Sequence, residues 1–230
     1  MSTYFCSDPH GEYELFCKAL ETVKFSASDK VYVLGDILDK GKDSLRLLDL
    51  IRSMPNAYAL TGNHEYMFLR YYNNALKEAE GDGKRLFDRL QEFYPNERTA
   101  FTPEQIRYLS SLPYFIEGKT FFAVHAGVAL GEGNRVLPME RQDTNVLLFD
   151  RKFKSDAVVP DDSKTVLFGH TPCSYDNGTG RMIKTLRKGL TKATRFTDYA
   201  KIRLDTGVAL TGTFGLFRAN DMVETYVKKD

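Results

Sequence analysis

Five short apolar runs, each followed directly by a turn of polar side chains, are the feature of this sequence that most restricts its fold. The runs occupy residues 3–6, 30–34, 57–60, 120–124 and 165–168. Each is rich in β-branched or aromatic residues, which is typical of a buried strand. The turns that follow contain SDPHG, GDILDKG, TGNHE, HAG and GHTP. We therefore expect a sheet whose strands lead into loops with chemically reactive side chains.

Helical patterns separate the first of these runs. Residues 12–22 carry apolar side chains at positions 13, 16, 19 and 20, and residues 43–52 place Leu45, Leu48 and Ile51 on one face. Strand, helix and strand in this order predict βαβ units. Residues 65–92 are helix-prone and mixed in charge, which predicts a solvated helical excursion.

The C-terminal part is richer in strand patterns. Residues 201–204, 214–218 and 222–227 read as strands, and residues 219–221 are typical of a hairpin turn between the last two. The sequence has no Pro/Gly/Ser-rich linker, internal repeat or low-complexity tract. It therefore predicts an α/β fold in a single domain that spans residues 1–230.

Composition narrows the class of protein. With 42% hydrophobic and 27% charged residues the chain is typical of a globular protein, and its net charge of +1 gives no general attraction to nucleic acid or to a membrane. The three cysteines lack CxxC spacing, which argues against a disulfide framework and a cysteine-built zinc site. The N-terminus has no pattern of a secretion signal, and no apolar run approaches a membrane span. We expect a cytoplasmic protein with no membrane partner.

The turns hold all four histidines of the chain, two aspartates at strand ends and an asparagine. Asp8 and His10 are two residues apart, so in an extended segment they point to the same side. The crevice beyond the carboxyl ends of the strands is where sites usually form in α/β sheets, so the turns could meet there. Carboxylate, amide and imidazole groups without thiolate fit manganese, iron or zinc and fit calcium poorly. The candidate residues are Asp8, His10, Asp36, Asn63, His64, His125 and His170.

The motifs D-x-H-G, G-D-x-x-D-[RK]-G, G-N-H-E, H-A-G and G-H-T, in this order, resemble those of the calcineurin-like metallophosphoesterases. More narrowly they resemble the phosphoprotein phosphatases, including the bacterial and lambda-phage serine/threonine phosphatases. The resemblance extends from Asp8 to about Gly207. It implies a four-layer sandwich of the metallophosphoesterase type, with two mixed β-sheets flanked by helices.

The resemblance also implies a role for each motif residue. Asp8, His10 and a shared Asp36 would hold the first metal ion. The ligands of the second metal ion would be Asp36, Asn63, His125 and His170. We favour manganese at both positions. His64 would act as the general acid, oriented by Asp39. Lys40, Arg151 and Asn63 would bind the substrate phosphate.

One departure from the family pattern concerns phosphate binding. Lys40 stands where the family usually has arginine, and lysine keeps the charge but lacks the planar, two-pronged contact with phosphate. A basic stretch from Arg181 to Arg203 follows the last histidine motif. It reads either as a solvated face or as a rim that attracts acidic or multiply phosphorylated substrates.

The sequence therefore predicts a phosphomonoesterase with two divalent metal ions. Two cations would lower the pKa of a bridging water to give a hydroxide for in-line attack on phosphorus, and His64 would protonate the leaving oxygen. The first hypothesis is a serine/threonine or dual-specificity protein phosphatase that acts on a phosphorylated protein or a small phosphoester. One alternative is a diadenosine tetraphosphate hydrolase. Another is a metal-binding scaffold without catalysis.

Overall fold

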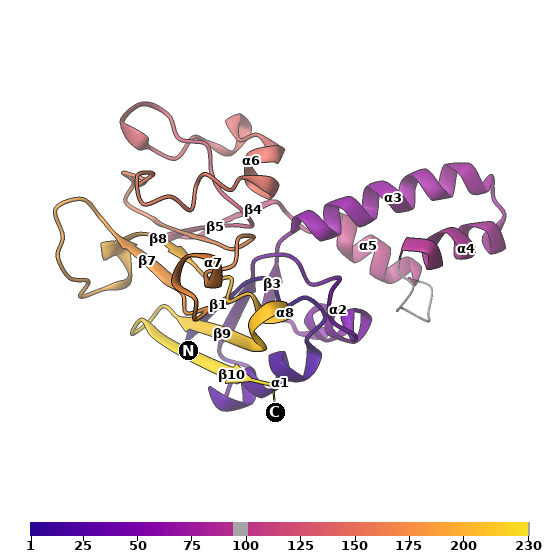
Figure 1. Ribbon diagram of the computed structural model, residues 1–230, viewed down its shortest axis with the longest axis horizontal. Helices are drawn as coiled ribbons and strands as arrows, with labels where there is room; N and C mark the ends of the chain where they lie inside the picture. Colours follow the sequence, from indigo (N-terminus) through magenta and orange to yellow (C-terminus); the bar gives the residue numbers. More distant parts are fainter. Residues whose placement is uncertain (94–100, 230) are drawn as a thin grey trace.

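The computed structural model describes residues 1–93 and 101–229, and its strands form two five-stranded mixed sheets (Figure 1). In the first sheet β1, β2 and β3 are parallel, while β9 runs antiparallel to both β1 and β10. The order across this sheet is β10 (Val223–Lys228), β9 (Thr213–Arg218), β1 (Thr3–Cys6), β2 (Lys30–Val33) and β3 (Ala57–Ala59). The predicted C-terminal hairpin is thus the β9–β10 edge of this sheet.

The second sheet has a parallel centre between two antiparallel edges. β5, β6 and β8 are parallel, and β4 and β7 each pair antiparallel with a neighbour. The order is β4 (Phe115–Glu117), β5 (Phe121–Val124), β6 (Thr165–Phe168), β8 (Tyr199–Arg203) and β7 (Ile183–Leu186). The edge strands β4 and β7 were not predicted, because neither has the apolar alternation of a half-buried strand.

The two sheets pack against each other through alternate side chains of their strands. Phe5 of β1 meets Phe121 of β5 with ring centroids 4.9 Å apart, in a core that also contains Leu167 and Ile202. Because successive side chains of a strand point to opposite faces, the neighbours of Phe5, Tyr4 and Cys6, face the helices. Both faces of the central strands are therefore buried, as their continuous apolar runs predict.

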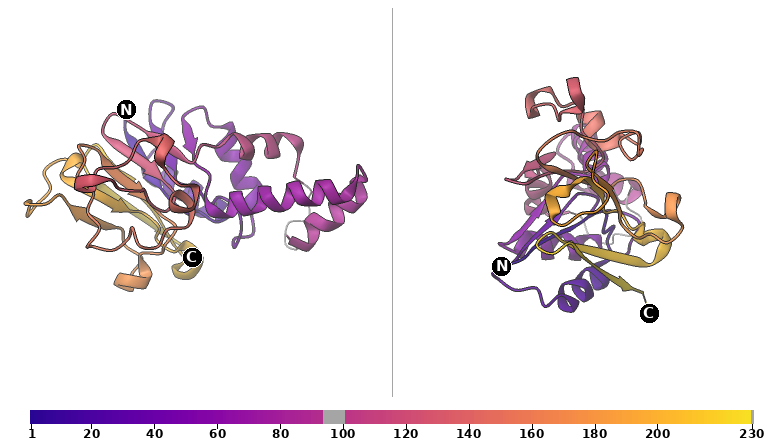
Figure 2. Two further views of the ribbon diagram at one scale, coloured as in Figure 1. Left: turned by 90° about the horizontal axis from the view of Figure 1, so that it is seen from above. Right: turned by 90° about the vertical axis from the view of Figure 1, so that its left-hand side faces the viewer.

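Helices cover the outer face of the first sheet, and one pair extends beyond it. Apolar side chains of α1 (Tyr13–Thr22), α2 (Ser44–Ser53) and α5 (Pro103–Ser111) join the core under this sheet. The helices α3 (Asn63–Ala79) and α4 (Gly83–Phe93) project away from the sheets as an arm (Figures 1 and 2). The predicted helical excursion at residues 65–92 is this arm.

Short helices and loops cover the second sheet. They include α6 (Thr144–Phe149) and α7 (Ser174–Asn177), with 3₁₀ turns at Glu132–Asn134, Met139–Arg141 and Phe196–Asp198. The short helix α8 (Val208–Thr211) instead contacts β9, and its Val208 joins the core under the first sheet. Phe153 packs under this layer against Phe168 of β6, with ring centroids 5.0 Å apart. The expected α/β sandwich of two mixed sheets is therefore present, and this layer is built mainly from loops.

Within residues 1–93 and 101–229, no helix combines the length and the apolar character that spanning a bilayer requires.

Candidate metal centre

The turns after β1 and β2 are joined through their backbones. The N–H of Asp8 donates to the carbonyl of Gly35 at 3.2 Å, and the N–H of His10 donates to the carbonyl of Asp36 at 2.9 Å. Asp8, His10 and Asp36 have φ angles of 53°, 43° and 54°, which lie in the left-handed region that non-glycine residues rarely occupy. Such conformations cost free energy and persist where surrounding contacts hold them, often at functional sites.

A glycine lets the third turn approach these two. A Cβ atom at Gly62 would lie 2.2 Å from Asp36 Oδ1 and 2.3 Å from the Asp36 nitrogen. Any larger residue would push the start of α3, which carries Asn63 and His64, away from Asp36. The G-N-H-E motif therefore needs its glycine for close packing at the carboxylate.

The first group of potential ligands consists of His10, Asp36 and His64, each offering one atom within 4.8 Å of the others. Asp36 Oδ2 lies 3.7 Å from His10 Nε2 and 3.8 Å from His64 Nε2. His64 was expected to act only as a proton donor, and Asp8 was expected in its place. Geometry alone therefore places His64 among the atoms that surround this position.

The second group shares Asp36 and adds His125 and His170. Asp36 Oδ1 lies 3.5 Å from His125 Nε2. Asn63 Oδ1 lies 2.8 Å from both His125 Nε2 and His170 Nδ1. The structure thus brings His10, Asp36, Asn63, His125 and His170 together from five separate turns, with Asp36 between the two groups.

Hydrogen bonds on the far side of two imidazoles show that this donor set fits cations. His125 Nδ1 lies 2.8 Å from the carbonyl of Leu34, and His10 Nδ1 lies 3.0 Å from the carbonyl of Leu38. A carbonyl only accepts, so Nδ1 carries the proton in each ring and Nε2 of the neutral ring presents a lone pair. These lone pairs face the carboxylate oxygens of Asp36. A cation between such groups would satisfy them all, and the carbonyls orient each ring as outer partners of metal ligands do.

Burial shifts the titration of these groups toward their uncharged forms. Burial raises the pKa of Asp36 to about 6, although the neighbouring His64 opposes this shift. Burial also lowers the pKa of His10 to about 2 and that of His170 to about 3, with further lowering by Lys40 at His10 and by His125 at His170. Both histidines are therefore neutral at physiological pH, which is the form that binds metal.

His64 is the histidine whose charged form is stabilised. Its Nδ1 donates a hydrogen bond to the Asp39 carboxylate, while its Nε2 points toward Asp36. Burial alone would lower the pKa of His64, but the bond to Asp39 and the charge of Asp36 outweigh burial and raise it. An imidazolium held in this way can donate a proton from Nε2, which is the property expected of a general acid.

Asp8 lies beside the two groups and makes its own contacts. Its carboxylate oxygens accept the backbone N–H of His170 at 3.2 and 3.1 Å, and the hydroxyl of Ser7 donates to the same carboxylate. Burial raises the pKa of Asp8 to about 6, and the charge of Asp36 adds to this effect. Asp8 thus links the first turn to the histidine turn after β6.

Two of the three predicted phosphate-binding residues, Lys40 and Arg151, line a cavity at the metal centre, whereas Asn63 is not among its walls. The cavity has a volume of about 170 Å³, and its walls include His10, Lys40, Arg151, His170 and Asp205. Lys40 Nζ lies 2.7 Å from His10 Nε2. Cationic groups at a small cavity over two potential metal positions form a suitable place for a phosphoryl group.

The sequence comparison decides the family. The profile of the calcineurin-like phosphoesterases matches residues 1–191.

The chain belongs to the calcineurin-like phosphoesterase family.

Relatives of this phosphoesterase carry a narrower name. A symmetrical bis(5'-nucleosyl)-tetraphosphatase from Aggregatibacter actinomycetemcomitans is 31% identical over 133 residues, which are 56% of this chain and 45% of the relative. The protein of the same name from Wigglesworthia glossinidia brevipalpis is 36% identical over 84 residues, 36% of this chain and 31% of the relative. The matched region spans less than half of the length of these relatives. They support the diadenosine tetraphosphate hydrolase hypothesis better than the protein phosphatase hypothesis.

Solved structures confirm the phosphoesterase fold. One that is provisionally named a diadenosine tetraphosphatase matches with a TM-score of 0.69 at 19% identity, covering 100% of this chain and 94% of that one. A cold-active protein tyrosine phosphatase matches with a TM-score of 0.57 at 17% identity, covering 99% and 79%. A protein serine/threonine phosphatase from Saccharomyces cerevisiae matches with a TM-score of 0.56 at 11% identity, covering 100% and 80%. At these identities the structures establish the fold and not the substrate.

Glu65 is a residue of the centre to which sequence reasoning gave no role. Its buried carboxylate accepts the backbone N–H groups of Asp36 and Gly62 at 2.8 Å and of Leu38 at 2.9 Å. Burial, with the charge of Asp36, raises the pKa of Glu65 to about 7. The signal was present in the sequence, because a glutamate three residues after the N-cap residue, here Gly62, is typical of a capping box.

Asp205 was also given no role, although its LDTG segment follows a strand. Its carboxylate accepts the N–H of Gly207 at 2.8 Å, and its backbone carbonyl accepts the N–H of Cys173 at 2.8 Å. Burial raises its pKa well above the usual range, and the charge of Asp8 contributes to the shift. Asp205 therefore joins the turn after β8 to the segment after His170.

The basic stretch does not form a rim around the centre. Its ends lie near the centre, because Ile183 pairs with Arg203, but residues 187–198 connect β7 to β8 at the opposite end of the sheet. Several of its cationic side chains form ion pairs, which are Lys184 with Glu224, Arg195 with Asp198 and Arg203 with Asp176. The structure therefore favours the reading of this stretch as part of the general surface.

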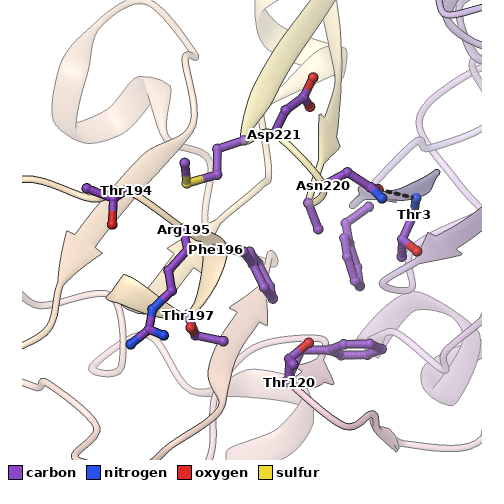
Figure 3. A pocket seen from close by; sticks show the side chains of 12 residues that line it. Thr3, Thr120, Thr194, Arg195, Phe196, Thr197, Asn220 and Asp221 are labelled. Atoms are coloured by element: carbon purple, nitrogen blue, oxygen red, sulfur yellow. Dashed lines mark hydrogen bonds between the residues drawn. The ribbon is translucent and has the colours of Figure 1, made fainter.

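A larger cavity lies at that opposite end and is separate from the metal centre. It has a volume of about 660 Å³ and opens beside Thr3 at the start of β1, with Thr120, Arg195 and Asp221 around it (Figure 3). Neither group of potential metal ligands contributes a residue to its walls. Size alone therefore does not mark the candidate active site.

Proposed function

We propose that this chain is a metal-dependent phosphoesterase that hydrolyses dinucleoside tetraphosphates. The observation that carries the hydrolase is the pair of ligand groups that share Asp36 beneath a cavity with Lys40 and Arg151. The observation that favours the substrate is the match to symmetrical bis(5'-nucleosyl)-tetraphosphatases at 31% and 36% identity.

The ligand roles are assigned to the residues that converge on Asp36 and to Asp8, which lies beside them. Asp8, His10 and Asp36 would hold one ion, and Asp36, Asn63, His125 and His170 would hold the other. Manganese suits these nitrogen and oxygen donors, as iron and zinc also do. Two such ions supply an activated water and neutralise charge on the phosphoryl oxygens.

The remaining residues act directly on the substrate. Lys40 and Arg151 bind the phosphate oxygens from the cavity wall, and the amide of Asn63 assists them. His64 donates the proton that the leaving phosphate oxygen needs, and Asp39 fixes the ring so that Nε2 faces the substrate. A general acid in such a position contributes roughly 10²- to 10⁴-fold to the rate.

A turnover panel with manganese tests the proposal. Diadenosine tetraphosphate, a phosphoserine peptide and a phosphotyrosine peptide are each titrated, and kcat/KM is compared. We expect diadenosine tetraphosphate to be preferred, with two molecules of ADP as products because the central P–O–P bond is hydrolysed. A higher kcat/KM for either phosphopeptide would favour the protein phosphatase hypothesis, which the likeness in fold to such enzymes keeps as the second candidate. The absence of any metal-dependent turnover would favour the hypothesis of a metal-binding scaffold without catalysis.

A further inference from the structure

Two exposed apolar side chains flank the cavity over the metal centre. Tyr175 is 61% exposed and Leu210 is 64% exposed, and among the large apolar side chains of residues 1–90 and 101–229 only Met1 is more exposed. Both line the same cavity as Lys40 and Arg151. Exposure of apolar side chains costs free energy, and apolar surface at a ligand cavity marks a binding surface.

The short helices that carry these side chains are fixed to each other. Tyr175 belongs to α7 and Leu210 to α8. A Cβ atom at Gly207, just before α8, would lie 3.0 Å from Ser174 Oγ and 3.1 Å from Pro172 Cβ, so only glycine allows this close approach.

Asp205 and Asp176 strengthen this arrangement. Asp205 bonds to the backbone of Gly207 on one side and to that of Cys173 on the other. Asp176, next to Tyr175, receives hydrogen bonds from Lys154 and from the buried Arg203. The backbone that carries Tyr175 and Leu210 is therefore held in place before any ligand binds, which lowers the entropy cost of binding.

We propose that Tyr175 and Leu210 form the surface on which one nucleobase of a dinucleoside polyphosphate stacks while its phosphates lie at Lys40 and Arg151. This inference rests on the proposed function and names the part of the substrate that the cavity rim selects. An aromatic face beside cationic groups matches a nucleotide, which joins a planar base to an anionic chain. Stacking of a base on an aromatic side chain is favourable and depends little on which base it is. Diguanosine and diadenosine tetraphosphates should therefore be hydrolysed at similar rates.

Substitutions of Tyr175 and Leu210 test the proposed surface. Each variant is assayed with diadenosine tetraphosphate, which has bases, and with glycerol 2-phosphate, which has none. We expect Tyr175→Ala to lower kcat/KM for diadenosine tetraphosphate about tenfold, mainly through KM. Turnover of glycerol 2-phosphate should stay within about twofold, because that substrate has no base to stack. Leu210→Ala should act in the same direction, and Tyr175→Phe should retain the wild-type value. Leu190→Ala is the matched control, since Leu190 is 42% exposed and lies in the distant β7–β8 connection.

Inhibition by ADP separates failure of the surface from failure of the proposed function. If the wild type does not hydrolyse diadenosine tetraphosphate, the proposed function is wrong, and ADP is then compared with inorganic phosphate as an inhibitor of glycerol 2-phosphate turnover. Stronger inhibition by ADP that is lost in Tyr175→Ala supports the surface in either case. If Tyr175→Ala lowers the turnover of diadenosine tetraphosphate and of glycerol 2-phosphate equally, Tyr175 has a structural role and the proposal is overturned. If Tyr175→Ala lowers only the turnover of phosphopeptides, the surface binds peptides and the proposal is also overturned.

Discussion

The carboxylate of Glu65 accepts the backbone N–H of Asp36 at 2.8 Å, so a residue of α3 fixes the turn that carries the shared carboxylate. The same side chain also accepts the N–H groups of Leu38 and Gly62. Three backbone donors that would otherwise be buried without partners are satisfied by one side chain. The fourth residue of the G-N-H-E motif is therefore a structural support for the metal centre.

Replacing Glu65 should destabilise the fold strongly. Glu65→Ala leaves three buried N–H groups without partners, and each such group costs about 1–3 kcal/mol. We expect the free energy of unfolding, measured by urea titration, to fall by at least about 3 kcal/mol. Glu140→Ala, at an exposed position, is the control and should change stability by less than about 0.5 kcal/mol. Similar values for the two variants would show that Glu65 does not support the turn.

His64→Asn tests whether His64 donates a proton or binds metal. If His64 is the general acid, kcat should fall by roughly 10²- to 10⁴-fold while the metal content of the purified protein stays unchanged. Asp39→Asn should lower kcat less, because the ring loses its orientation but keeps its proton. Elemental analysis beside the kinetic assay distinguishes the two roles. Loss of metal from His64→Asn would make His64 a ligand, as its position 3.8 Å from Asp36 allows.

Metal should stabilise the protein more at pH 7.5 than at pH 5. Burial raises the pKa of Asp8 and of Asp36 to about 6 and that of Glu65 to about 7, whereas unfolded Asp and Glu titrate near 4. Between these values the three carboxylates bind more protons in the folded chain than in the unfolded chain, so they lower the stability of the metal-free protein as pH rises from about 4 to about 7. The lowered pKa values of His10 and His170 act in the opposite direction, because these rings lose their protons on folding. A cation offsets the buried negative charge, and protons compete with it at low pH.

Thermal unfolding with a chelator and with manganese, at both pH values, measures this effect. We expect the difference in Tm between the two conditions to be larger at pH 7.5. A difference that is equal at both pH values, or larger at pH 5, would contradict the account of the buried carboxylates. Variation of the chelator controls for an effect of the chelator itself.

The sequence was sufficient to predict which side chains converge, because they sit in local motifs. Each predicted strand leads directly into its turn, and parallel strands bring their carboxyl ends to one edge, so convergence of Asp36, Asn63 and His125 followed from order along the chain. Glu65 supports the centre through three hydrogen bonds to the backbone of two different turns, and a local sequence pattern does not predict all three. The edge strands β4 and β7 depend on pairing with β5 and β8 more than on their own periodicity.

The exposed residues of the site were harder to predict for a physical reason. Tyr175 and Leu210 lie in helices of four residues each, too short for a periodic signal. The basic stretch left two readings open for a related reason, because charge in a sequence does not show which side chains already have partners. Arg195 has its partner three residues away at Asp198, and Lys184 has one on β10 at Glu224.

Lys201→Met should weaken phosphate binding through Arg151. The buried ammonium group of Lys201 donates at 2.7 Å to the carbonyls of both Phe153 and Ser155, which follow Arg151 in the same loop. Methionine fills similar space but cannot hold these carbonyls, so the loop that carries Arg151 should become less ordered. We expect KM for glycerol 2-phosphate to rise about tenfold, equivalent to about 1.4 kcal/mol, with a smaller change in kcat.

The double variant with Arg151→Ala decides whether this effect passes through Arg151. In the Arg151→Ala background Lys201→Met should raise KM no further, because the group that it positions is already absent. Lys201→Arg should restore part of the wild-type KM, and Lys192→Met, at an exposed position of the β7–β8 connection, is the control. Additive changes in KM would show that Lys201 stabilises the fold without positioning Arg151. No change in KM for Arg151→Ala alone would instead remove Arg151 from phosphate binding.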